Sequence, residues 1–149
     1  MKKLLLFLLL ILPAIIQAQL TPEEETRIEE LKGIINSDAH DTSRINAMKE
    51  WSDMVYYFDV RQDSLLLDKI IRVCDENLET DVSVKERRFY MKEQARALDY
   101  LATIFTQSSR YSVAVDMHKK AIELYAAVNI IEGMDGAWIN LGNALYDNG

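Results

Sequence analysis

The spacing of apolar residues constrains the fold of this chain more than any other feature of its sequence. These residues recur every three or four positions, as a helix with one buried face requires, and no stretch alternates with the period of two that marks a strand. Clear runs of this spacing are Ile28, Leu31 and Ile35, then Ile45, Met48, Trp51, Val55 and Phe58, then Leu67, Ile70, Cys74 and Leu78. Only five Gly and two Pro occur in 149 residues. We therefore predict an all-α fold of six helices joined by short loops.

Capping residues predict where several helices begin. Thr21 precedes Pro22, and Glu24 follows three residues after Thr21, which is the pattern of a capping box. This first helix is expected to end near Asn36. The other predicted starts are Asp41 or Thr42 for the second helix, Asp63 or Ser64 for the third, about Val82 for the fourth, about Tyr111 for the fifth and about Glu132 for the sixth.

The first 18 residues have the pattern of a secretory signal peptide. Lys2 and Lys3 precede an apolar run at residues 4–12, and Ala18 offers a small residue for cleavage. The run is shorter than the roughly 20 residues that span a bilayer, so no membrane span is expected after cleavage, although an uncleaved anchor is the alternative. With Cys74 as the only cysteine, no internal disulfide can form. Export without disulfides favours a periplasmic or periplasm-facing location.

The charge of the chain argues against two classes of partner. The sequence has a net charge of −7, and removal of Lys2 and Lys3 leaves 15 basic against 24 acidic residues. Nucleic acid and anionic membrane surfaces repel such a chain. We therefore expect no nucleic-acid partner for this segment.

A repeated pattern of large and small residues is the basis of a family resemblance. One stretch reads large, large, small, large, then aromatic, small, small, at Leu98, Leu101, Ala102, Phe105, Tyr111, Ala114 and Ala121. The frame recurs 40 residues later as Trp138, Leu141, Gly142 and Gly149, and 47 residues earlier as Trp51, Met54, Val55, Phe58, Ser64, Leu67 and Cys74. This pattern resembles the tetratricopeptide repeat (TPR), in which small residues allow two antiparallel helices to approach closely. Val55 and Leu67 depart from it, because they stand where small residues are expected.

The resemblance implies an architecture and a division of the chain. It implies antiparallel helix pairs stacked as a TPR-like right-handed superhelix, an α-solenoid. Residues 1–18 are then the signal peptide, residues 19–47 hold an N-terminal capping helix and the start of the second helix, and residues 48–149 hold the repeats. The repeats would occupy residues 48–81 and 95–128, with a half repeat at 135–149. Leu98, Leu101, Phe105, Ala114 and Ala121 are expected in one continuous core.

The resemblance also implies a groove for a protein or peptide partner. TPR grooves are lined by fixed positions of the first helix of each repeat. In this register the candidate groove residues are Lys49, Ser52, Tyr56, Arg96, Asp99, Thr103, Asn143 and Tyr146. TPRs that hold a peptide carboxylate use Lys and Asn there, and Asn143 lacks the flanking basic pair, which disfavours carboxylate capture.

No motif in the sequence points to catalysis, a cofactor or a metal. His40 and His118 lack nearby ligands at a metal-binding spacing, and residues 75–81 are acidic but lack the order of a calcium loop. Cys74 is predicted to be a buried core thiol. We therefore expect no enzyme, no cofactor and no metal site.

The predicted function is that of an exported TPR scaffold that mediates protein–protein interaction. It resembles the sensory N-terminal region of bacterial signal-transduction proteins. The alternative is a helical ligand-binding or enzyme domain with its site on the concave face. Because the third repeat stops at Gly149, before its second helix, we expect a fragment with Trp138, Leu141 and Leu145 only partly covered. Self-association through the C-terminal helix is the expected consequence.

Overall fold

The computed structural model describes residues 20–149, and the predicted signal peptide lies outside the described residues. This part of the chain contains six helices and no strand, which confirms the all-α prediction. The helices are α1 (Pro22–Ile35), α2 (Asp41–Val55), α3 (Val60–Leu78), α4 (Val84–Gln107), α5 (Tyr111–Ala127) and α6 (Ile131–Asp147).

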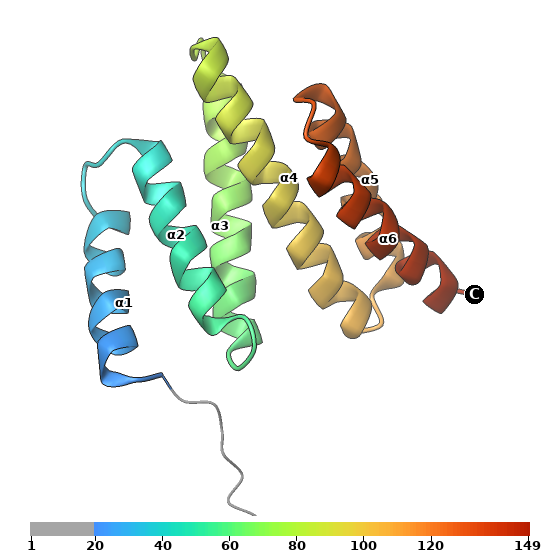
Figure 1. The fold of residues 1–149 in the computed structure, drawn as a ribbon, viewed down its shortest axis with the longest axis horizontal. Helices are drawn as coiled ribbons and strands as arrows, with labels where there is room; N and C mark the ends of the chain where they lie inside the picture. Colours follow the sequence, from blue (N-terminus) through green and yellow to red (C-terminus); the bar gives the residue numbers. More distant parts are fainter. Residues whose placement is uncertain (1–19) are drawn as a thin grey trace, which may run out of the picture.

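Consecutive helices run in opposite directions and pack against one another (Figure 1). In addition, α4 contacts both α2 and α6, so these three helices are neighbours although they do not follow each other in the chain. In the view of Figure 1 they lie in front of α3 and α5. The spaces between α2 and α4, and between α4 and α6, are therefore the places where side chains distant in sequence meet.

The observed caps confirm some predicted helix starts and correct others. Thr21 forms the predicted capping box with Glu24, and α1 ends at the C-cap Asn36. The cap of α2 is His40, one residue before the predicted start, because its Nδ1 accepts from the backbone of Thr42. The predictions for α3 were wrong: its cap is Asp59, whose carboxylate accepts from the backbone of Gln62 at 2.9 Å.

Two equivalent turns hold α4 against α5 and α5 against α6. Ser109 and Asn129 have φ angles of 58° and 56°, in the left-handed region. The amide of the following residue then reaches back to a carbonyl of the last helical turn, from Arg110 to Phe105 at 2.8 Å and from Ile130 to Tyr125 at 3.0 Å. This is the Schellman ending, which satisfies helix carbonyls while the chain reverses in very few residues.

The core is divided into two clusters instead of the single continuous core predicted. Leu101 belongs to the cluster of the N-terminal helices, whereas Leu98, Ala114 and Ala121 belong to the C-terminal cluster. Phe105 is half-buried and packs against both clusters. The division arises because opposite faces of α4 pack against different neighbours.

Three small residues of the predicted repeat at residues 95–128 lie in the core. Ala102, Ala114 and Ala121 are fully buried. Because protein interiors are close-packed, we expect little room for a larger side chain at these positions. The predicted close approach of α4 and α5 is consistent with this burial.

We expect Ala114→Leu to destabilise the protein by about 1–3 kcal/mol, because the added methylenes must displace packed neighbours. Urea unfolding followed by circular dichroism measures the effect. Ala126→Leu is the matched control, since Ala126 lies exposed on the same helix. Equal stabilities for the two variants would show that Ala114 is not tightly packed.

Cys74 is a buried core thiol, as predicted. Burial raises its pKa to about 12, and the nearby carboxylates of Glu93, Asp75 and Asp41 contribute to the shift. Because the thiolate is the reactive form, we expect no alkylation of Cys74 by iodoacetamide in the folded protein and rapid alkylation in urea. Mass spectrometry reports the modified fraction, and modification at equal rates in both conditions contradicts a core position.

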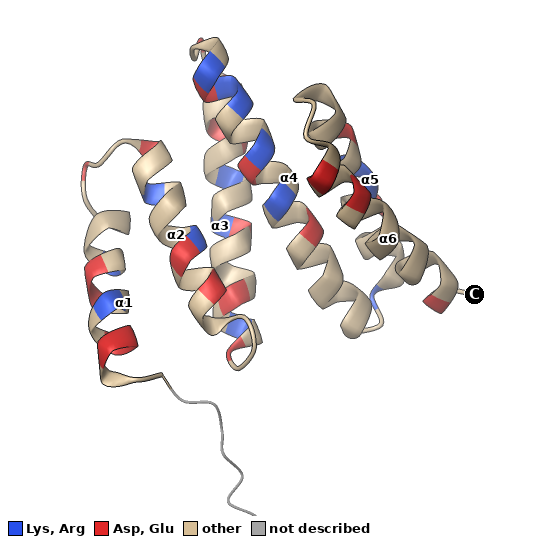
Figure 2. Cartoon of the chain, viewed as in Figure 1, with Lys and Arg blue, Asp and Glu red and all other residues tan. Residues whose placement is uncertain are grey.

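Residues 136–146 of α6 include no Asp, Glu, Lys or Arg (Figure 2), and several apolar side chains of this helix are exposed. Trp138 is 55% exposed and Ile139 is 66% exposed. Leu141, however, is buried, which corrects the expectation that it would be only partly covered. Within residues 20–149, no helix is long and apolar enough to span a membrane.

Candidate functional site

A cleft lined by tyrosines lies between α2 and α4. Its lining consists of Asp53, Tyr56, Tyr57 and Tyr100, and it encloses about 310 Å³. We refer to these four residues as the tyrosine cleft. A second hollow of about 220 Å³ shares Tyr56 and Tyr57 and extends past Thr103 to Gln107. The two hollows are neighbours, because Tyr56 and Tyr57 line both of them.

Of the ring pairs in the tyrosine cleft, Tyr56 and Tyr57 meet edge to face and Tyr56 and Tyr100 are tilted, so neither pair is stacked flat. Tyr56 and Tyr57 have centroids 4.7 Å apart at an interplanar angle of 80°, and Tyr56 and Tyr100 are 6.1 Å apart at 43°. Tyr57 is 88% exposed. Such an arrangement leaves aromatic surface open to a ligand while the rings support one another.

Arg96 of α4 forms one wall beside the cleft. Its guanidinium carbon lies 4.6 Å from the centroid of the Tyr100 ring, and its Nη2 donates to Asp53 Oδ1 of α2 at 2.5 Å. The ion pair with Asp53 therefore joins α4 to α2, whereas the cation–π contact with Tyr100 lies within α4.

A buried acid lies next to the cleft. Ser52 Oγ donates to Asp63 Oδ1 at 2.5 Å, and Asp63 Oδ2 has no hydrogen-bond partner. Burial raises the pKa of Asp63; the charge of Asp53 raises it further, while the Ser52 hydrogen bond and Arg96 oppose the rise. The pKa of Tyr56 is also raised, chiefly by burial, with contributions from the neighbouring tyrosines and Asp63. Asp63 therefore interacts electrostatically with two residues that line the cleft, Asp53 and Tyr56.

Asp63 makes a pH-dependent contribution to stability. Its pKa in the folded protein is above the ordinary value of 3.8, so the folded state binds this proton more tightly than the unfolded state does. The stabilisation that comes from this bound proton is complete when the pH is below the pKa of Asp63 in the unfolded chain. It is lost as the pH rises through the pKa of Asp63 in the folded protein. We therefore expect the free energy of unfolding of Asp63→Asn, relative to wild type, to increase with pH from 3.8 upward.

Urea titrations at several pH values measure this difference. Asp116→Asn is the control, because Asp116 is exposed on α5. A difference between Asp63→Asn and wild type that does not change with pH would contradict the raised pKa.

A second cluster of buried and partly buried polar side chains joins α4, α5 and α6. Asp99 Oδ1 lies 2.7 Å from His118 Nδ1, and Asp99 Oδ2 accepts from Asn140 Nδ2 at 3.0 Å. His118 is fully buried, and its Nε2 has no partner. The neutral tautomer with the proton on Nδ1 fits this network best, since it places no unpaired N–H in the core. We call Asp99, His118 and Asn140 the three-helix node.

The predicted groove residues of α2 and α4 fall into two groups. Tyr56 and Thr103 line the cleft or its extension, and Arg96 stands beside it. Lys49 is half-buried and pairs with Glu93 of α4 at 3.3 Å. Ser52 and Asp99 are buried, because each is used in a hydrogen bond to a neighbouring helix, so neither reaches the surface where a partner would bind.

The other two predicted groove residues lie apart from the cleft. Asn143 and Tyr146 are exposed on α6, which contacts α4 and α5 and not α2. Three lining residues, Asp53, Tyr57 and Tyr100, were absent from the prediction. In the predicted register Asp53 and Tyr100 share one position, but that position was not among those expected to line the groove, so the register gave no signal for them.

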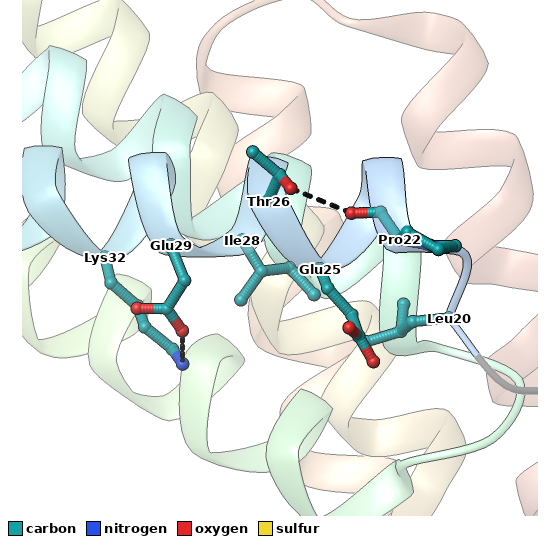
Figure 3. A pocket seen from close by; sticks show the side chains of 7 residues that line it. All are labelled: Leu20, Pro22, Glu25, Thr26, Ile28, Glu29 and Lys32. Atoms are coloured by element: carbon teal, nitrogen blue, oxygen red, sulfur yellow. Dashed lines mark hydrogen bonds and ion pairs between the residues drawn. The ribbon is translucent and has the colours of Figure 1, made fainter.

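A further hollow of about 510 Å³ runs along α1 (Figure 3). Its polar side chains are used in contacts within the helix and do not converge on one point. Glu29 pairs with Lys32 at 2.6 Å, and the hydroxyl of Thr26 donates to the carbonyl of Pro22. Leu20 and Ile28 supply its apolar surface. The hollow involves only α1 and the residue leading into it, so it is a weaker candidate than the cleft between two helices.

Metal-ligating side chains are not grouped in the described part of the chain. Among residues 20–149, no three His, Cys, Asp or Glu side chains come together in a way that could hold a metal ion. His40 lies at the exposed start of α2, where its Nε2 is 3.2 Å from Glu86. The two histidines therefore lie at separate places, one on the surface and one in the three-helix node.

Comparisons with protein families, with curated proteins and with solved structures found no match to this chain. The tyrosine cleft and the arrangement of the helices are therefore the observations from which a function can be argued.

Proposed function

We propose that this chain is a TPR-like scaffold that binds a peptide or helical segment of another protein in the tyrosine cleft. The observation that carries the proposal is the exposure of Tyr57, in the turn that follows α2, at a cleft that Tyr56 and Tyr100 also line. Tyrosine is enriched among the residues that dominate binding energy at protein interfaces. Two neighbouring open hollows that share Tyr56 and Tyr57 could receive successive side chains of a peptide segment.

The arrangement of the helices supports the TPR-like part of the proposal. Contacts of α4 with both α2 and α6 fit a row of first helices, with α3 and α5 as second helices. The complete burial of Ala102, Ala114 and Ala121 fits the small positions of that repeat. In such an array the first helices line the concave surface of a right-handed superhelix.

The signal-peptide pattern adds a location to the proposal. Lys2, Lys3 and the apolar run at residues 4–12 favour export to the periplasm, and the resemblance favours a sensory role in a signalling protein. A fusion of residues 1–30 to alkaline phosphatase, which is active only after export, tests the location. A fusion of a known signal peptide to alkaline phosphatase is the positive control. If the control is active and the fusion of residues 1–30 is inactive, the proposed location is wrong.

The three-helix node is the feature closest to a catalytic group, yet its chemistry is structural. Asp99 uses both carboxylate oxygens, one for His118 and one for Asn140. Neither Asp99 nor His118 lines the tyrosine cleft. We therefore propose binding as the function and assign no catalytic step.

Selection from a random peptide display library tests the proposed function. Peptides are selected on the wild-type protein, and their affinities are then measured for Tyr57→Ala and Tyr146→Ala. These two tyrosines make a matched pair, since Tyr57 in the turn between α2 and α3 is 88% exposed and Tyr146 on α6 is 87% exposed. We expect selected peptides to bind Tyr57→Ala more weakly and Tyr146→Ala unchanged. Failure to select any peptide that discriminates between the two variants would overturn the proposal.

A further inference from the structure

The tyrosine cleft already accepts one guanidinium group, which belongs to the chain itself. Arg96 lies over the face of Tyr100 at 4.6 Å and pairs with Asp53. Aromatic faces carry partial negative charge and attract cations. The internal contact therefore shows which kind of group this combination of ring and carboxylate can hold.

The cleft offers more aromatic and acidic surface than Arg96 covers. The side chain of Asp53 is 55% exposed even though one of its oxygens pairs with Arg96. The rings of Tyr56 and Tyr57 also line the open space, and Tyr57 is almost fully accessible. A second cation could therefore contact both a ring and a carboxylate without displacing the buried part of Arg96.

The local charge also favours a cation. Asp53 presents a half-exposed carboxylate, and the buried carboxyl of Asp63 lies close enough to Asp53 and Arg96 to interact with both. The chain as a whole has a net charge of −7. The carboxylate at the cleft and the net negative charge of the chain therefore both attract a positively charged partner.

We infer that the tyrosine cleft binds an arginine side chain presented by a peptide segment of another protein. The inference rests on the proposed peptide-binding function and names the chemistry of the ligand. Arginine fits better than lysine because a planar guanidinium stacks on a ring while it donates to a carboxylate, as Arg96 does.

The direct test uses a fluorescein-labelled peptide of alternating glycine and arginine, with a citrulline peptide of the same length as its neutral isostere. Fluorescence anisotropy at fixed ionic strength gives both affinities. We expect the wild-type protein to bind the arginine peptide more tightly than the citrulline peptide. Tyr57→Ala should lower the affinity for the arginine peptide by about 2- to 5-fold, which is the contribution of an exposed cation–π contact. Tyr146→Ala should leave it unchanged.

Two charge variants separate binding at the cleft from general attraction to an acidic protein. Asp53→Asn should lower the affinity for the arginine peptide more than Asp116→Asn does. The second variant removes an exposed acid from α5. Arg96→Gln should strengthen binding, since it frees Tyr100 and Asp53, and it should do so more than Arg72→Gln. Arg72 is a fair control, because it also pairs with an aspartate, Asp68, at 2.8 Å.

The outcomes distinguish this inference from the proposed function. Equal affinity for arginine and citrulline peptides, or equal losses for each cleft variant and its control, overturns the inference. If display selection then yields peptides that need Tyr57 but lack arginine, the peptide-binding function stands and only the ligand chemistry is wrong. If no selected peptide depends on Tyr57, both proposals fall. Selected peptides that carry arginine and lose affinity in Tyr57→Ala support both.

Discussion

Leu67→Ala is expected to destabilise the protein by about 2–5 kcal/mol, because it removes a fully buried side chain and leaves a cavity. Leu67 lies on α3 in the N-terminal core cluster, among side chains that cannot fully collapse into the vacated space. Urea unfolding followed by circular dichroism measures the loss. Little effect would mean that the packing around Leu67 is loose.

Leu65→Ala is the matched control for this experiment. Leu65 lies two residues away on the same helix and is 58% exposed, so its truncation should change stability by less than about 0.5 kcal/mol. The pair also separates loss of helix propensity from loss of packing, since both variants make the same substitution in one helix.

In the predicted repeat register Leu67 and Ala114 share one position, although the two side chains differ in size. Each is fully buried, but Leu67 packs in the N-terminal cluster and Ala114 in the C-terminal cluster. Exchange of the two sizes is therefore expected to be unfavourable in both directions, through a cavity at Leu67 and overpacking at Ala114.

The sequence predicted the helices well because their signals are local. Apolar period and capping chemistry depend on residues within one or two turns, as in the box formed by Thr21 and Glu24. The start of α3 was mistaken because Asp59 and Asp63 are equally good caps by composition. Only the fold decides between them, since it buries Asp63 against Ser52 of α2 and leaves Asp59 free to cap.

The candidate site was predicted only in part because its lining depends on how α2 and α4 are rotated. The repeat register placed Tyr56 and Arg96 near a groove, and both are at the cleft. It missed Tyr57 and Tyr100, which stand at positions that the register assigns to no groove. It also placed Asp99 on the surface, whereas contacts with two other helices hold it inside. Such contacts join residues 19 and 41 positions apart, so no local pattern reveals them.

The three-helix node gives the second large expected effect. Asp99→Ala removes the acceptor of both His118 and Asn140, and it leaves the His118 ring buried with no partner on either nitrogen. We expect a loss of roughly 2–4 kcal/mol in the free energy of unfolding, because an unpaired buried polar group keeps its full desolvation cost. Hydrogen exchange should also rise in α5 and α6 more than in α1, since α1 does not contact the helices that the node joins.

Two further variants show whether the loss comes from the hydrogen bonds or from the shape of the side chain. Asp99→Asn keeps the shape and one acceptor oxygen, so it should lose less stability than Asp99→Ala. The double variant Asp99→Ala with His118→Ala should lose less than the two single losses combined, because once Asp99 is gone, removal of His118 also removes an unpaired ring. Additive losses, or an Asp99→Ala variant as stable as wild type, would show that the contact of 2.7 Å does not hold α4 and α5 together. In that case the helices would be held by apolar packing alone, and the position of α4 beside the tyrosine cleft would not depend on the node.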